Sequence, residues 1–186
     1  MAEQVCPWWM GYWLISPVRR WSTGNPESLL GRFVQEGMTV LEPGPGMGFF
    51  TLPMARLVGE SGRVIAVDIQ AKMLDKLEQR AYAADLLDRI EVRVAEPDRF
   101  TMPEWKNTID FVLAFAVVHE MPSAEAFFLE AAAALKPQGV LFFAEPVGHV
   151  SEARFERELE GARHAGFVIA DQPYVRNSRT AVMRKV

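Results

Sequence analysis

Residues 40–51 read VLEPGPGMGFFT, and this stretch decides the fold that the rest of the chain must fit. The residues before the glycines, 39–41, form a short apolar run that predicts a buried strand. Three glycines at alternate positions stop the strand, and residues 50–57 then have helical spacing. Such a turn brings bare backbone close to a ligand, because glycine has no Cβ and can adopt positive φ. It also directs the free N–H groups of the helix start toward that ligand.

A second predicted strand, Arg63–Asp68, ends in a carboxylate. Asp68 follows the glycines by about twenty residues, the spacing at which an acidic side chain can hydrogen-bond ribose hydroxyls in a strand–helix–strand unit. The glycine turn and this aspartate together indicate a ligand that contains a nucleoside. They do not by themselves choose between nucleoside cofactors.

The spacing of the glycines narrows that choice. The dinucleotide fingerprint G-x-G-x-x-G/A, counted from Gly44, requires a small residue at position 49, where this chain has Phe49. Residues 42–48, EPGPGMG, instead resemble the E/D-x-G-x-G-x-G motif of class I S-adenosylmethionine-dependent methyltransferases. The resemblance covers about residues 38–146, and the chain is similar to the small-molecule group that includes quinone-biosynthesis C-methyltransferases. It implies S-adenosyl-L-methionine as cofactor and S-adenosyl-L-homocysteine as product.

The resemblance also implies the fold class. We expect an α/β, Rossmann-like, doubly wound sheet of seven strands, mostly parallel with an antiparallel last strand, and helices on both faces. The remaining sequence pattern agrees with it. It predicts a helix from the Asn25 cap to Gly37, helices over 70–87, 124–135 and 151–165, strands over 89–94, 110–115, 140–144, 166–170 and 179–184, and a turn at 136–139.

Cofactor-binding residues follow from the resemblance, position by position. An acid in the loop after the third strand commonly accepts a hydrogen bond from the adenine amino group, and Glu96 aligns there, with Asp98 as the alternative. The family more often has Asp followed by a small residue, so Glu96-Pro97 departs from its pattern. Ile69 would pack on the adenine ring, or be an ordinary core isoleucine. The implied cofactor-binding set is Glu42, Gly44, Pro45, Gly46, Gly48, Asp68, Ile69, Glu96 and Phe115.

His119 is the best candidate for a catalytic base, with Glu145 as the second catalytic candidate. Histidine titrates near neutral pH, and ligands of open α/β sheets bind at the carboxyl ends of the strands, where both residues are predicted. We expect Glu120, Glu145 and His149 to lie on the same rim as His119. Each of these residues also has a purely structural interpretation, and Glu145 could instead bind substrate or cap a helix. His164 is predicted to be a surface residue.

Composition excludes several other kinds of site. A single cysteine, Cys6, rules out an intramolecular disulfide framework and argues against thiol-chelating chemistry that needs several cysteines. We expect no metal site, since the adjacent His119 and Glu120 should point apart on an extended chain. The net charge of −4 gives no general attraction to nucleic acid or anionic lipid. No basic leader or membrane-spanning run is visible in the sequence. We therefore expect a cytoplasmic location and no stable membrane insertion.

Two parts are predicted along the chain. Residues 1–24 carry four of the five tryptophans and form an aromatic lid or packing segment, while residues 25–186 form a single methyltransferase domain. Tryptophan suits pocket walls and interfaces, so the segment could wall the acceptor pocket, pack on the domain edge or contact a second subunit. Anchoring to a membrane surface is the less favoured alternative, because the segment has few basic residues.

These observations predict an enzyme that transfers a methyl group from S-adenosylmethionine to a small-molecule acceptor, apolar or aromatic in character. The alternatives are a nucleic-acid methyltransferase and a non-catalytic S-adenosylmethionine-binding protein. A nicotinamide oxidoreductase is disfavoured by Phe49. We expect no nucleic-acid partner, and a monomer or a homodimer.

Overall fold

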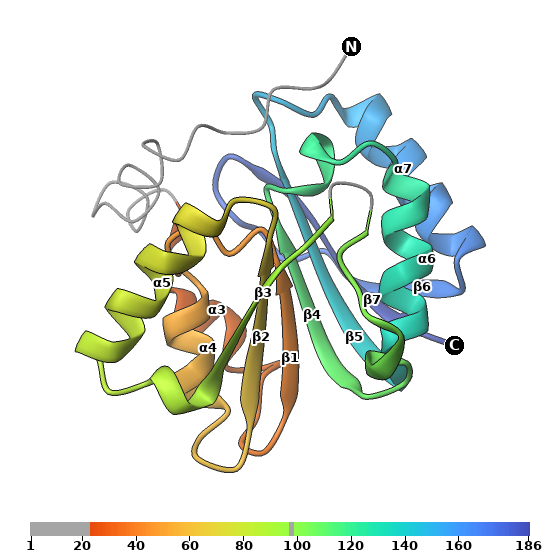
Figure 1. Cartoon of the computed structure of the whole chain (residues 1–186). Coiled ribbons are helices and arrows are strands. Elements are labelled where there is room, and N and C mark those ends of the chain that lie inside the picture. Colours follow the sequence, from red (N-terminus) through yellow and green to blue (C-terminus); the bar gives the residue numbers. More distant parts are fainter. Residues whose placement is uncertain (1–22, 97–98) are drawn as a thin grey trace. The chain divides into compact units, whose positions relative to one another are not determined.

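The computed structural model describes residues 23–96 and 99–186, which fall into two compact units that divide after Glu96 (Figure 1). We call residues 23–96 the N-terminal unit and residues 99–186 the C-terminal unit. The predicted aromatic segment 1–24 lies almost wholly outside the described residues, as does Asp98. The predictions made for them therefore stay predictions.

The N-terminal unit contains three parallel strands in the order β3-β2-β1. All three predicted strands are confirmed: β1 is Thr39–Pro43, β2 is Arg63–Asp68 and β3 is Ile90–Val94. Helices α4 and α5 follow β1 and β2 along the chain and pack on the sheet. The helices of this unit are α3 (Pro26–Leu30), α4 (Thr51–Leu57), α5 (Ala71–Ala83) and the 3-10 turn η2 (Leu87–Arg89).

Two helices of this unit are shorter than predicted. Asn25 caps α3 as expected, accepting a hydrogen bond from the Glu27 N–H at 3.0 Å. The helix nevertheless ends at Leu30 and not near Gly37, because glycine at position 31 is a poor helix former and a turn follows. Helix α5 ends at Ala83 and not at 87, because Asp85 adopts a left-handed conformation with φ of +56° that a helix cannot continue.

The C-terminal unit contains four strands in the order β4-β5-β7-β6. Strand β4 is parallel to β5, whereas β7 is antiparallel to both β5 and β6, as predicted for the end of the sheet. The strands are β4 (Ile109–Phe115), β5 (Leu135–Pro146), β6 (Phe167–Asp171) and β7 (Ser178–Lys185). The helices are α6 (Ala124–Ala134) and α7 (Glu152–His164), with 3-10 turns η3 (Pro103–Trp105) and η4 (Val118–Glu120).

The turn predicted at residues 136–139 is wrong, because these residues belong to β5. Ile109 of β4 pairs with Leu135 of β5, and Phe111 pairs with Val140. The two pairs are close together on β4, but their partners are separated by several residues on β5, so β5 contains a bulge there. Gln138 absorbs the irregularity with φ of +65°. The strand therefore begins immediately after α6, without an intervening loop.

Aromatic side chains fill the core between β5 and the helices of the C-terminal unit. Phe143 stacks on Phe155 of α7 with ring centroids 5.2 Å apart, and meets Phe128 of α6 edge-on at 5.3 Å. Side chains alternate along a strand, so Glu145, two residues beyond Phe143, lies on the same face of β5. The packing of these helices thus fixes the face on which Glu145 lies.

The predicted fold class is confirmed, since the seven strands form a mixed sheet with a Rossmann-like arrangement and an antiparallel end. The carboxyl ends of β1, β2, β4 and β5 carry most of the residues that the sequence singled out. Among the described residues, no helix has the length and apolar character needed to cross a membrane.

Candidate active site

The glycine turn after β1 explains why glycines occupy alternate positions. Gly44, Gly46 and Gly48 all have φ in the left-handed region, at +67°, +54° and +84°. Any other residue would be strained there. At Gly48 a Cβ would also lie 2.7 Å from Leu52 Cδ1, so this position packs against α4 as well.

A buried carboxylate joins the end of β1 to the start of α4. Glu42 is 3% exposed, and its Oε2 accepts a hydrogen bond from the Thr51 hydroxyl at 2.6 Å. This contact crosses the base of the glycine turn and holds its two ends together. Thr51 stands in the stretch that decides the fold, but the sequence did not indicate this role for it.

Arg80 is a second support of the glycine turn, and the sequence analysis missed it. Its guanidinium reaches from α5 and donates a hydrogen bond to the backbone carbonyl of Met47, inside the turn. Burial lowers the pKa of Arg80 from its ordinary value. No sequence signal marks this contact, since an arginine on an amphipathic helix reads as a surface residue.

Asp68 lies at the carboxyl end of β2, as predicted. Its Oδ1 accepts a hydrogen bond from the Gln70 N–H at 2.9 Å, which orients the carboxylate. Ile69 is 41% exposed, so it is not the ordinary core isoleucine of the alternative interpretation. Glu96, after β3, is also exposed.

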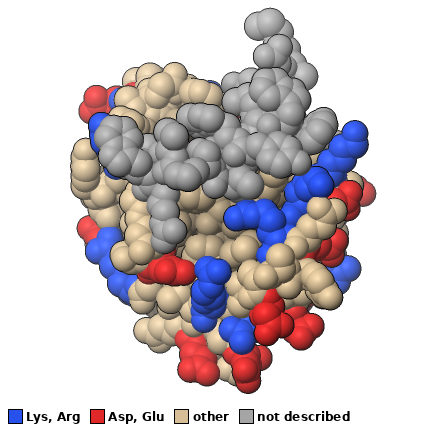
Figure 2. Space-filling view, turned by 90° about the vertical axis from the view of Figure 1, so that its left-hand side faces the viewer, with Lys and Arg blue, Asp and Glu red and all other residues tan. Residues whose placement is uncertain are grey.

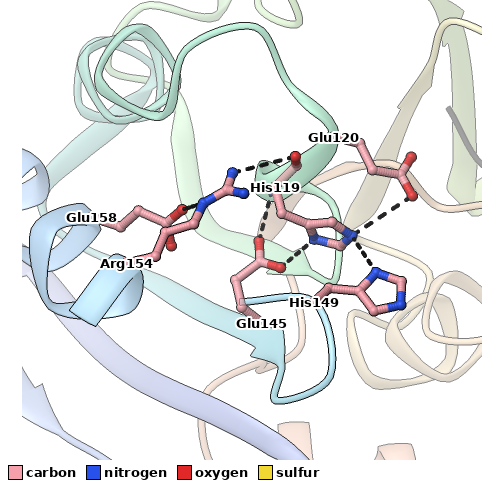
Figure 3. A network of polar contacts seen from close by, with 6 residues as sticks. All are labelled: His119, Glu120, Glu145, His149, Arg154 and Glu158. Carbon is pink, nitrogen blue, oxygen red and sulfur yellow. Dashed lines mark hydrogen bonds and ion pairs between the residues drawn. The ribbon is translucent and has the colours of Figure 1, made fainter. Parts of the chain in front are cut away.

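In the C-terminal unit, Glu145 at the end of β5 holds His119 from two sides (Figure 3). Its Oε1 accepts a hydrogen bond from the His119 backbone N–H at 3.2 Å, and its Oε2 contacts His119 Nδ1. Glu145 is 0% exposed and His119 is 9% exposed. A carboxylate only accepts hydrogen bonds, so Nδ1 carries the proton and Nε2 is the basic nitrogen of neutral His119.

Two further side chains lie on the Nε2 side of His119. His149 Nδ1 is 3.3 Å from Nε2, and the two rings meet edge-on with centroids 5.1 Å apart. Glu120 Oε1 is 3.9 Å from Nε2. The expected convergence of these residues is confirmed, but the prediction that His119 and Glu120 point apart is wrong. They lie in the 3-10 turn η4 and not on an extended chain.

The surroundings of His119 act on its pKa in opposite directions. Burial lowers the pKa, while the hydrogen bond and negative charge of Glu145, and then the charge of Glu120, raise it. Arg154 lowers it. The net result is a pKa above the ordinary histidine value, so the two glutamates together outweigh burial.

Helix α7 supplies an outer support for His119 that the sequence analysis did not identify. Arg154 donates to the His119 carbonyl at 3.4 Å and to Glu158 Oε1 at 3.0 Å. Glu158 is 6% exposed, and burial raises its pKa. The apolar spacing of Phe155 and Leu159 could have identified the inner face of α7.

Two other residues that the sequence singled out also lie in this unit. Phe115 ends β4 and is partly buried, and His164 is exposed at the end of α7, as expected. Across residues 23–96 and 99–186, no group of three His, Cys, Asp or Glu side chains is placed to hold a metal ion. The arrangement in this unit is thus an imidazole oriented by a buried carboxylate, which can accept or hold a proton.

Comparison with known proteins places these features in a family. The Rossmann-like sheet, the glycine turn and the strand-end aspartate are typical of a nucleoside-binding protein, and the comparisons identify this one as an S-adenosylmethionine-dependent methyltransferase. The chain belongs to the methyltransferase domain family, whose model matches residues 34–172. In structure it is similar to a SAM dependent methyltransferase from Aquifex aeolicus, with a TM-score of 0.84 and 26% identity over 97% of this chain and 98% of that one.

Two relatives of known activity match a shorter segment. The arsenite methyltransferase of Halobacterium salinarum is 29% identical over 116 residues, which cover 62% of this chain and 28% of that protein. The ubiquinone/menaquinone biosynthesis C-methyltransferase UbiE of Salmonella arizonae is 29% identical over 117 residues, or 61% of this chain and 46% of that protein. The matched segment therefore spans less than half of either relative.

Proposed function

We propose that this methyltransferase modifies a small-molecule acceptor, apolar or aromatic in character, and that the Glu145–His119 pair takes up the proton that the acceptor loses. The observation that carries the proposal is the burial of His119 with both Glu145 oxygens directed at it. An imidazole fixed in this way has one tautomer and one basic nitrogen. A positioned base of this kind contributes about 10²–10⁴ in rate.

The N-terminal unit provides the residues that we propose hold S-adenosylmethionine. Its three positive-φ glycines leave backbone uncovered by side chains, which fits the close approach of an adenosyl amino acid. Asp68, oriented by Gln70, suits the ribose hydroxyls. The remaining proposed contacts in this unit are Glu42, Pro45, Ile69 and Glu96. Phe115, which ends β4 of the C-terminal unit, stays a predicted contact.

The chemistry divides between the bound cofactor and the chain. S-adenosylmethionine, when bound, supplies a methyl group already activated by its sulfonium. The chain must orient the acceptor and remove its proton, and orientation alone can be worth roughly 7–11 kcal/mol. Acceptors that arrive protonated, at carbon, oxygen or nitrogen, need such a base, whereas a thiolate does not.

The character of the acceptor is inferred from the relatives and from composition. One of the two relatives is named as an arsenite methyltransferase, and the other as a C-methyltransferase of ubiquinone/menaquinone biosynthesis. A single cysteine disfavours arsenite chemistry that depends on several thiols. The net charge is −4, and acidic and basic side chains are interspersed on the face shown in Figure 2, which gives no support to a nucleic-acid substrate. A wall formed by residues 1–24 remains a prediction.

One experiment tests the proposal in two stages. Calorimetry should first show binding of S-adenosylhomocysteine but not NADH. Release of S-adenosylhomocysteine is then followed with phenols, quinols, arsenite with thiol, and transfer RNA as separate acceptors. Turnover with a phenol or quinol supports the proposal, and turnover only with RNA or arsenite contradicts it. Cofactor binding without turnover on any acceptor would favour the non-catalytic alternative.

A further inference from the structure

We infer that His149, and not His119, takes the proton from the acceptor, and that it passes a proton on to the buried Glu145–His119 pair. This inference rests on the proposed function, because it assigns the first step of the same proton transfer. It makes His149 the group of the cluster that contacts the acceptor. His119 and Glu145 then act as the proton store behind it.

The imidazole of His149 is more accessible to a ligand than that of His119. His119 is 9% exposed, its Nδ1 is engaged by Glu145, and its basic Nε2 faces His149 Nδ1 at 3.3 Å (Figure 3). The His149 ring therefore lies next to the nitrogen that an acceptor would have to reach for direct proton transfer to His119. His149 is an exposed residue whose Nδ1 meets His119, so its Nε2 is the nitrogen available to a ligand.

The position of His149 is set by a short, well-anchored turn. The backbone N–H groups of His149 and Val150 both donate to the Pro146 carbonyl, at 3.0 Å and 2.9 Å. Val150 is fully buried, and the next residue, Ser151, caps α7 by accepting from the Arg154 N–H at 3.2 Å. The exposed imidazole is therefore held between the end of β5 and the start of a helix, and it is not carried by a long loop.

The proton transfer balances with the two neutral imidazoles that the geometry indicates. The acceptor atom forms its bond to the methyl carbon as the methyl–sulfur bond breaks, and the electron pair of that bond stays on sulfur. The acceptor's proton moves to His149 Nε2, and the His149 Nδ1 proton moves to His119 Nε2. The positive charge lost by sulfur is then carried by His119, which returns one proton to water by the reverse route.

The charged groups around His119 favour its role as the store. Glu145 contacts Nδ1 and Glu120 lies 3.9 Å from Nε2, so two carboxylates face the imidazolium that forms. Arg154 opposes the charge, but it is paired with Glu158 through a 3.0 Å hydrogen bond. An exposed imidazole alone would have no such stabilisation, which explains why a relay would serve better than His149 by itself.

The test uses the three histidines of the chain, since each can be followed separately. Substitution His149→Gln should lower kcat on the order of 10²-fold, without a comparable change in S-adenosylhomocysteine affinity. Added imidazole should restore part of the activity of His149→Gly. The matched control His164→Gln, on the exposed end of α7, should leave kcat unchanged.

A second readout does not depend on turnover. In NMR titrations of the full chain, His149→Gln should shift the titration of His119, because the two rings are in contact, while His164→Gln should not. If the wild type methylates no acceptor, the proposed function fails. If it turns over and His149→Gln retains wild-type kcat, or loses activity that imidazole does not restore, this inference alone is overturned. An unshifted His119 titration would also overturn it.

Discussion

The glycine turn of the N-terminal unit and the histidine cluster of the C-terminal unit are built on opposite principles. The turn is made of backbone, with three alternate residues at positive φ. The cluster is made of side chains, with a fully buried carboxylate directed at an imidazole. The glycine turn is therefore suited to bind a ligand through the shape of its backbone, whereas the histidine cluster is suited to stabilise a charge. Substitutions should therefore separate binding from chemistry.

The largest effect should come from the histidine cluster. Substitution His119→Gln removes the proton store and should lower kcat by about 10²–10⁴. Cofactor affinity, measured by calorimetry with S-adenosylhomocysteine, should change by less than about twofold, since no glycine-turn residue is altered. An equal loss of cofactor affinity and of kcat would show that cofactor binding and proton transfer are not separated between the two regions.

The next largest effect should come from Asp68. Substitution Asp68→Ala should weaken S-adenosylmethionine binding by about 10–100-fold, because hydrogen bonds to a charged group contribute roughly 1.5–3 kcal/mol. At saturating cofactor, kcat should stay close to that of the wild type. Asp75→Ala, on the exposed face of α5, is the control and should bind normally. Unchanged affinity in Asp68→Ala would remove this residue from the binding region.

A smaller effect is expected on stability. Substitution Gly48→Ala places a Cβ at φ of +84° and 2.7 Å from Leu52 Cδ1. We expect it to lower the free energy of unfolding by about 1–3 kcal/mol. Thermal denaturation checks this, with Gly148→Ala as control, since no atom lies within 4 Å of a Cβ there. Equal melting temperatures for both variants would mean that the turn tolerates side chains.

The smallest effect should be a shift in pH dependence from Glu120→Gln. The charge of Glu120 helps to raise the pKa of His119, so its removal should lower that pKa. Uptake of a proton requires neutral His119, so kcat rises as pH increases through this pKa. The acidic limb of the kcat profile should move to lower pH in the variant. Glu156→Gln, exposed on α7, should leave the limb in place, and a shift toward higher pH would contradict the assignment.

The sequence predicted the glycine turn far better than the histidine cluster, for a physical reason. Glycine adopts positive φ more readily than any other residue, so the alternate spacing of Gly44, Gly46 and Gly48 is a signal visible directly in the sequence. Strand ends at Asp68 and Glu145 were also predictable, because apolar runs stop there. These local signals carried the family resemblance that implied the fold class and the cofactor.

What the sequence could not supply depends on contacts between distant residues. His119 and Glu145 are 26 residues apart, and His119 and His149 are 30 apart. Topology predicted that these residues would lie near one another, but not which nitrogen meets which oxygen. The support from Arg154 was missed because Glu and Arg on α7 satisfy a surface pattern equally well. The bulge in β5 was missed because Lys136–Gly139 has turn composition.

The contact between Arg80 and the Met47 carbonyl has a consequence for the kinetics of cofactor capture. The Arg80 guanidinium, on helix α5, already binds a carbonyl of the glycine turn. This contact keeps the turn in one conformation before the cofactor binds. Because the turn is already ordered, cofactor binding does not have to meet the entropic cost of ordering a glycine-rich segment. Cofactor uptake should therefore follow a single fast phase, with no slow rearrangement after the encounter.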